Sequence, residues 1–331
     1  MVPSRSGQHG IFVMNSDTTG GKLLTPDPSA QLRASSWSPD GKKIAFFAQR
    51  REDSDILSKY RTPLHYPLYV MDAAGGDRKR LLDFPVSSFE WSPDSRQLLY
   101  ISAYEDPNHD DPSVLRGTKA PMSAIYVLNL QTGEQRRLSS FGQNCSGAWS
   151  PDGTQLALSF GTDQYSDIFT VSLDGKHTRR LTDSKSINIR PAWSPDGKAL
   201  AYVSVAAPGA EDGSAGVYVT NADGTNKRRV SSMIAFGAAW SPDGKSLLLQ
   251  WAGGASLADA DGKKTINVTP GIGRSMDAVF TPDGQEVMFR SDHEGEWYLF
   301  AVNLNGSNLR KITGNLSASM FCLSPLLSRE K

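Results

Sequence analysis

Hydrophobic and polar residues alternate along this chain as short apolar strands separated by polar turns. One recurring run reads Trp37-Ser38-Pro39-Asp40-Gly41, and an apolar segment such as 43–47 follows it. In this turn proline presets φ, aspartate bonds nearby backbone N–H groups and glycine takes a left-handed conformation. The segments are rich in β-branched and aromatic residues and lack helix caps, which predicts strands. Further copies begin, 40 to 58 residues apart, at Trp91, Trp149, Trp193, Trp240 and Phe280, with a remnant at Leu323.

A second unit alternates with the first. It consists of an apolar strand, a tight turn and a basic strand that ends in Leu-Thr or similar residues, as in 217–230 and 168–182. Asp-Gly, Asn-Gly and Gly-Gly pairs at the turn favour two-residue hairpins, because these residues tolerate positive φ. Each full repeat therefore contains four strands, named A to D. Strand A leads into the Trp, B follows the Pro-Asp-Gly turn, and C and D form the second hairpin.

Four-stranded units that recur about every 40 residues predict a β-propeller. Six complete units run from 37 to 313, with a C–D hairpin left over at 11–25 and an A-like strand at 319–323. These two pieces complement each other. We therefore expect one all-β propeller domain over residues 1–331, seven-bladed, with a closing blade shared by the two termini and completed by 326–331 if it has a B strand. A six-bladed ring with extra terminal strands is the alternative.

These motifs resemble the TolB-like, PD40 class of WD40-like propeller repeats. Trp193-Ser194-Pro195-Asp196-Gly197-Lys198 and Asn221-Ala222-Asp223-Gly224 match that repeat almost letter for letter, and the resemblance covers nearly the whole chain. It implies the propeller fold. Relatives include periplasmic scaffolds that bind proteins, propeller domains that precede serine peptidases, sensor domains and a few lyases, so it does not specify one function. Nothing resembles the helical N-terminal domain of TolB, so the resemblance does not imply a role in the Tol system.

Composition narrows the possible partners and locations. Lys plus Arg and Asp plus Glu are 35 each, so the net charge of zero argues against a nucleic-acid partner. No apolar stretch approaches 18 residues, so no membrane insertion is expected, and we expect a monomer. The resemblance implies a periplasmic or secreted protein, although residues 1–10 lack the apolar core of a signal peptide and leave a cytoplasmic location open. Cys145 and Cys322 lie on A strands of non-adjacent blades, so both are predicted to be free thiols.

Two long B–C loops, at about 49–67 and 102–123, belong to adjacent blades and lie on the same face of the predicted ring. Loops that diverge on a uniform scaffold are a common place for function. The first carries aromatic and basic side chains that suit peptide or glycan ligands, namely Tyr60, Arg61, His65 and Tyr66. The second carries carboxylates beside a histidine that suit Ca²⁺ or another divalent ion, without a recognised spacing: Asp106, His109, Asp110 and Asp111. An ordinary solvated loop is the alternative for both.

The predicted inner strands carry mostly small residues, as expected where strands converge on an axis. Four charged residues on or near these strands break the pattern and are candidates to line the channel mouth and bind a polar ligand or ion: Arg33, Glu90, Arg190 and Asp277. The alternative is a hydrated channel without a specific ligand.

No Gly-x-Ser-x-Gly, His-Glu-x-x-His or paired-cysteine motif is present. The leading hypothesis is therefore a non-catalytic scaffold that holds a protein, peptide or glycan on the face with the long loops and needs no cofactor apart from Ca²⁺ if the acidic loop binds it. The alternative is a lyase or hydrolase acting on a polysaccharide or small polar substrate at the axial pocket. It would use His65 or His109, with Arg61 or Arg33 stabilising negative charge. A sensor or accessory domain of a larger protein is a third hypothesis.

Overall fold

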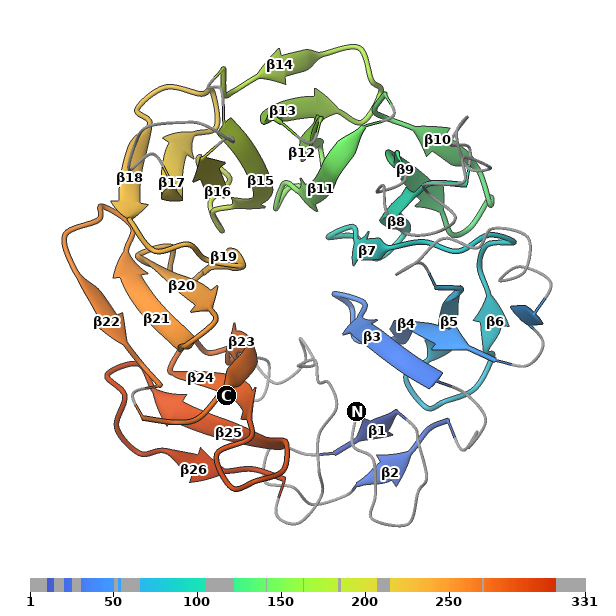
Figure 1. Cartoon of the computed structure of the whole chain (residues 1–331). Coiled ribbons are helices and arrows are strands. Elements are labelled where there is room, and N and C mark those ends of the chain that lie inside the picture. The colour runs from blue at the N-terminus through green and yellow to red at the C-terminus, as the bar shows by residue number, and fades with distance from the viewer. Residues whose placement is uncertain are drawn as a thin grey trace.

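The computed structural model describes residues 11–14, 21–25, 31–50, 53–54, 66–104, 122–140, 142–162, 164–183, 186–206, 215–269 and 271–313. Its strands form four-stranded antiparallel units, which are the blades of a ring around a central opening (Figure 1). The all-β propeller predicted from the repeat is therefore confirmed. Among the described residues, no helix has the length and hydrophobicity that crossing a membrane requires.

Each blade runs from an innermost to an outermost strand in chain order. The blades comprise β3 (Gln31–Trp37), β4 (Lys43–Gln49), β5 (Leu68–Asp72) and β6 (Lys79–Arg80); β7 (Ser88–Trp91), β8 (Gln97–Ser102), β9 (Ala124–Asn129) and β10 (Gln135–Arg137); β11 (Gln143–Trp149), β12 (Gln155–Gly161), β13 (Ser166–Ser172) and β14 (Thr178–Arg180); β15 (Ser186–Trp193), β16 (Ala199–Ala206), β17 (Gly216–Asn221) and β18 (Arg228–Ser231); β19 (Gly237–Trp240), β20 (Ser246–Trp251), β21 (Gly254–Asp259) and β22 (Thr265–Asn267); and β23 (Ser275–Phe280), β24 (Glu286–Ser291), β25 (Tyr298–Asn303) and β26 (Arg310–Lys311).

Side-chain hydrogen bonds lock the turn between strands A and B. In the first blade Ser38 Oγ donates to Asp40 Oδ1 at 2.7 Å, and that oxygen accepts the N–H of Lys42 at 3.0 Å. Ser38 Oγ also accepts the N–H of Lys43 at 2.9 Å. The Ser-to-Asp bond recurs in the other A–B turns, with Thr281 in place of Ser in the last blade. These aspartates are therefore turn residues, as the sequence pattern suggested.

A hydroxyl group closes the hairpin between strands C and D, which explains the Leu-Thr ending of the second unit. Thr269 Oγ1 accepts the N–H of Ala255 at 2.9 Å, and the backbone N–H of Val268 bonds to the carbonyl of the same Ala255 at 3.0 Å. Equivalent bonds join Ser139 to Ile125, Thr182 to Ile168 and Thr313 to Leu299.

Tryptophan side chains connect one blade to the blade before it. The indole N–H groups of Trp91, Trp193 and Trp240 donate to the carbonyls of Ser36, Ala148 and Ala192 at 3.2, 3.3 and 3.0 Å. The hydrophobic core lies between blades as well. One cluster joins Phe47 and Leu68 of the first blade to Leu98 and Tyr100 of the next. Packing between neighbouring blades therefore supplies the core of this fold.

A separate two-stranded sheet, β1 (Phe12–Val13) and β2 (Lys22–Leu23), lies between the blades β3–β6 and β23–β26 in the ring (Figure 1). Its contacts match those of a C–D hairpin. Thr25 Oγ1 accepts the N–H of Ile11 at 2.7 Å, and the N–H of Leu24 bonds to the carbonyl of Ile11 at 2.7 Å. Leu24 also packs against Gly75 in the C–D turn of the next blade. The predicted closing strand at 319–323 lies outside the described residues.

Thr269→Val tests the hydroxyl that closes the C–D hairpin. The change removes the acceptor of the Ala255 N–H at a site where Thr269 is 1% exposed. We expect a loss of about 1–3 kcal/mol in the free energy of unfolding, because a buried donor loses its partner. Urea denaturation measures this loss. The same substitution at exposed Thr265 in β22 is the matched control, and equal effects at the two positions would refute the assignment.

Candidate binding face and axial channel

Charged residues of the inner strands lie at β-bulges. In β3, Leu32 pairs with Ala48 and Ser35 pairs with Phe46, so Arg33 and Ala34 together oppose one residue of β4. The same irregularity occurs in β11, β15 and β23, where it involves Asn144 with Cys145, Arg190 with Pro191, and Asp277 with Ala278. Bulges re-aim side chains and are common beside functional sites. Three of the four charged residues predicted at the channel mouth therefore share one structural position.

Arg190 is held in an uncommon conformation that places its guanidinium in solvent. Its φ is 55°, and its backbone N–H donates to Ser146 Oγ of the preceding blade at 2.8 Å. Its side chain is exposed and extends toward the following blade, where Nη1 lies 3.8 Å from the position that a Cβ on Gly237 would take. Left-handed conformations of non-glycine residues cost free energy, and they occur at bulges and turns as well as at functional sites. Arg190 thus bridges three blades.

Asp277 has a similar backbone, with φ of 54°, but its charge is already balanced. Arg290 Nε donates to Asp277 Oδ2 at 2.7 Å. The Arg290 guanidinium also lies 5.3 Å from the centre of the Trp297 ring, and Arg274 lies 5.5 Å from the same ring. Asp277 therefore belongs to a charged cluster around Trp297. Arg33 lies in β3, but its side chain is outside the described part of the structure.

Glu90 occupies a position where neighbouring blades have small residues. Its carboxyl accepts a hydrogen bond from the backbone N–H of Trp149 in the next blade. Burial raises the pKa of Glu90 to about 8, against the lowering effect of that bond. β7 is the innermost strand of its blade (Figure 1), and Glu90 is half-buried there. At pH 7 the carboxyl is therefore mostly protonated.

The side chain of Trp149 shows how Glu90 changes the contact between the blade of β7 and the blade of β11. Its indole Nε1 is buried and has no hydrogen-bond partner, whereas Trp91, Trp193 and Trp240 each donate to a carbonyl of the preceding blade. The residues before the tryptophan in those preceding blades are Ser36, Ala148 and Ala192, and the equivalent residue here is Glu90. The contact between β7 and β11 therefore lacks the indole bond and has a carboxyl bond in its place.

Most of the predicted loop residues lie outside the described part of the chain: Tyr60, Arg61, His65, Asp106, His109, Asp110 and Asp111. Cys322, which was predicted on an A strand, also lies outside it. Tyr66 is described and packs into the core, with its ring 5.9 Å from that of Phe47 and its backbone bridged to Val86. This contact favours the packing interpretation of Tyr66. Cys145 is a free thiol, and burial raises its pKa to about 12. Within the described ranges, no group of three or more His, Cys, Asp or Glu side chains has the arrangement of a metal site.

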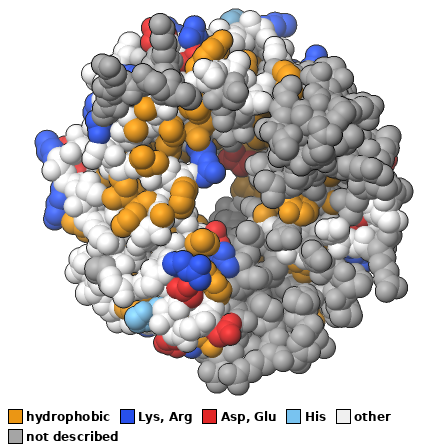
Figure 2. Space-filling model, viewed as in Figure 1, with side chains coloured by type: hydrophobic (Ala, Val, Ile, Leu, Met, Phe, Trp, Pro, Cys, Tyr) orange, Lys and Arg blue, Asp and Glu red, His pale blue; other side chains and the backbone are white. Residues whose placement is uncertain are grey.

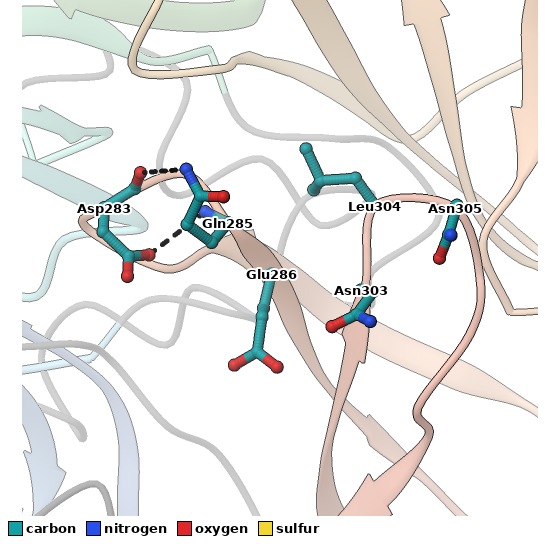
Figure 3. Close-up of a pocket in the computed structure, with 6 residues that line it drawn as sticks. All are labelled: Asp283, Gln285, Glu286, Asn303, Leu304 and Asn305. Atoms are coloured by element: carbon teal, nitrogen blue, oxygen red, sulfur yellow. Dashed lines mark hydrogen bonds between the residues drawn. The ribbon is translucent and has the colours of Figure 1, made fainter.

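A polar depression of about 550 Å³ lies beside the turns of the last blade (Figure 3). Asp283 accepts the N–H of Gln285 at 3.1 Å, Glu286 is paired with Arg310, and Asn305 accepts the N–H of Ser307 at 3.0 Å. These polar groups are occupied by the turns themselves and by a strand pair. The depression therefore results from the shape of the turns. It is a weaker candidate binding site than the opposite face of the ring.

Exposed hydrophobic side chains, which the sequence analysis missed, mark the face with the B–C and D–A loops. Tyr165, Ile234, Phe236 and Met276 all lie at this end of the strands, whereas Leu309 lies in a C–D turn at the other end. Figure 2 shows hydrophobic side chains gathered beside the central opening over the region of β19 to β21. The run 233–236 was the available signal, because it is apolar where a polar D–A connection is expected.

Blades built on Trp-Ser-Pro-Asp-Gly turns, with the loops of one face exposing apolar and basic side chains, define a β-propeller of the repeat type predicted from the sequence. The model of the TolB β-propeller domain, PD40, matches residues 56–252. The chain belongs to this family.

Individual relatives are similar in sequence to parts of this chain. The uncharacterised peptidase YuxL of Bacillus subtilis is 27% identical over 173 residues, 45% of this chain and 25% of that protein. The Tol-Pal system protein TolB of Alcanivorax borkumensis is 33% identical over 124 residues, 37% of this chain and 23% of that protein. The matched regions thus span about a quarter of these relatives. The crystal structure of oligogalacturonate lyase from Vibrio parahaemolyticus has a TM-score of 0.66 at 16% identity, covering 90% of this chain and 84% of that chain, which shows a common fold.

Glu90→Gln tests the protonated carboxyl between β7 and β11. The folded protein keeps the proton up to about pH 8, whereas an unfolded glutamate releases it near pH ~4.3. Stability from this group is therefore complete at low pH and falls as pH rises from about 4.3 to about 8.

We expect the wild-type melting temperature to fall more than that of Glu90→Gln between pH 5 and pH 9, by roughly 2–4 °C for each kcal/mol of stability lost. Scanning calorimetry at the two pH values measures the difference. Glu296→Gln, at an exposed position, is the control and should follow the wild type. Parallel pH curves for Glu90→Gln and wild type would show that Glu90 is ionised in the folded protein.

Proposed function

We propose that the protein is a non-catalytic scaffold that holds a protein partner on the face with the B–C and D–A loops. The exposed hydrophobic side chains on that face support this proposal: Ile234 is 62% exposed, Tyr165 53% and Phe236 51%. Apolar side chains that gather on one surface of a folded protein are typical of interaction sites. The two long loops at about 49–67 and 102–123 belong to the same face by their place in the repeat.

Family membership is consistent with a scaffold in an exported protein. A Tol-Pal system protein is among the relatives, so we propose a protein as partner and a periplasmic location. A peptide or glycan ligand, Ca²⁺ bound by the acidic loop and a monomeric state stay predictions from the sequence. A ligand contact by Tyr60, Arg61 or His65 also stays a prediction from the sequence.

We also propose that the ring has seven blades in one domain over residues 1–331. The hairpin β1–β2 supports this count, because it has the Thr25 hydroxyl contact of a C–D hairpin and packs against the next blade as other C–D hairpins do. An A strand from 319–323 would complete its sheet. Closure by strands from both termini would bind the first and last blades without a disulfide.

Deletion of 105–119 tests the scaffold on the proposed face. We expect the deletion to reduce capture of a specific partner from a periplasmic extract at least tenfold, because it removes most of one long loop. Mass spectrometry of captured proteins measures the effect. Lys176→Glu, in an exposed C–D turn on the opposite face, is the control. Equal capture by wild type and deletion, or capture of no specific protein by either, contradicts the proposal.

An enzyme acting on a polysaccharide or small polar substrate is the second candidate. The observation in its favour is the left-handed backbone of Arg190 and Asp277 beside the channel, since strain of this kind clusters at active sites. His65, His109 and Arg61 are its proposed catalytic residues. A panel of glycan and ester substrates should then show turnover that His65→Ala or His109→Ala lowers at least a hundredfold. Turnover that these variants leave unchanged, or no turnover at all, excludes this candidate.

A further inference from the structure

Three exposed hydrophobic side chains lie on the loop face of neighbouring blades. Ile234 and Phe236 lie in the connection from β18 to β19, and Met276 is the second residue of β23, in the next blade. Their exposed fractions are 62%, 51% and 43%. Figure 2 shows hydrophobic side chains beside the central opening, basic side chains at that opening, and a group of basic and acidic side chains over β23 and β24. We name the surface of Arg190, Ile234, Phe236, Arg274 and Met276 the basic-apolar strip.

An arginine stands at each end of the strip. Arg190 is exposed, and its guanidinium lies against Gly237, the neighbour of Phe236. Within the described residues, this guanidinium has neither a hydrogen bond nor an ion pair, so its charge is available to a ligand. Arg274 at the other end has a side chain that is 70% exposed and pairs with Asp292 at 2.7 Å. Such an exposed ion pair contributes little free energy, so a carboxylate of a ligand can share or replace it.

The chemistry of the strip distinguishes between occupants. Planar aromatic side chains favour stacked sugars, whereas the strip offers Ile234 and Met276 on either side of a single phenyl ring. A second copy of this chain would bring its own arginines to the strip, and like charges across an interface are unfavourable. Guanidinium groups pair best with carboxylates, and burying exposed apolar side chains adds about 25 cal/mol for each Å².

We propose that the basic-apolar strip docks an extended acidic segment of a partner protein, with apolar side chains on Phe236 and Met276 and carboxylates at Arg190 and Arg274. This inference rests on the proposed scaffold function and assigns part of the contact to the half of the ring opposite the long loops. We expect Arg190 to determine specificity here, because its left-handed backbone and the Ser146 bond fix the main chain from which its guanidinium extends.

Selection of random 12-residue peptides on the immobilised full chain tests the strip without a known partner. We expect enriched peptides to carry Asp or Glu around apolar residues and to bind with micromolar Kd. Phe236→Ser and Arg190→Glu should each weaken binding of these peptides at least tenfold. Leu309→Ser and Lys176→Glu make the same chemical changes on the opposite face and should leave Kd within twofold. Melting temperature and circular dichroism confirm that each variant is folded.

The outcomes separate this inference from the proposed function. Peptides that lack acidic residues, or that bind Phe236→Ser and Arg190→Glu as tightly as wild type, overturn the strip as an acidic docking site. If deletion of 105–119 still abolishes partner capture, the scaffold function stands without the strip. A wild-type dimer in sedimentation that Phe236→Ser converts to monomer assigns the strip to a second copy and also overturns the inference. Failure to enrich any peptide also overturns the inference.

Discussion

The fold depends on each blade covering the hydrophobic face of its neighbour. A single four-stranded sheet leaves large apolar side chains in water, and the core cluster that joins Phe47 and Leu68 to Leu98 and Tyr100 forms only when two blades meet. Trp91, Trp193 and Trp240 each add a directional bond to this packing, from the indole N–H to a carbonyl of the preceding blade. A ring satisfies every blade in this way, whereas an open row of blades leaves two hydrophobic ends.

The local bonds explain why one repeat accepts very different loops. The A–B turn is fixed by its own Ser and Asp, and the C–D hairpin by the hydroxyl of its last residue, as in Thr269. The first device does not involve the B–C or D–A connections, and the second uses only the start of the D–A connection. Those connections lie together on one face, and their length and sequence vary while the blade keeps its structure. The same face carries the strained Arg190, the cluster around Trp297 and the exposed Phe236.

The repeat motifs predicted the strands, the hairpins and the propeller, because each motif residue has a local role that follows from its chemistry. The site was only partly predictable. Arg190 and Asp277 were recognised as charges in a background of small residues, but the bulges and the Arg290 partner of Asp277 depend on strand pairing. Phe236 and Met276 were missed because the repeat motifs do not reach the D–A connection or the start of strand A. The missing indole bond of Trp149 appears only when the blades are placed side by side.

The repeated turn also lowers the stability of the ring at acidic pH. Hydrogen bonds from Ser150, Ser194 and Ser241, followed by bonds from backbone N–H groups, lower the pKa of Asp152, Asp196 and Asp243. A lowered pKa adds stability at neutral pH that disappears as the carboxyl takes up its proton. Because the same turn recurs in successive blades, acidification weakens several turns together. The raised pKa of Glu90 acts in the opposite direction, since its contribution is lost as pH rises. The turns and the contact between β7 and β11 therefore respond to pH in opposite directions.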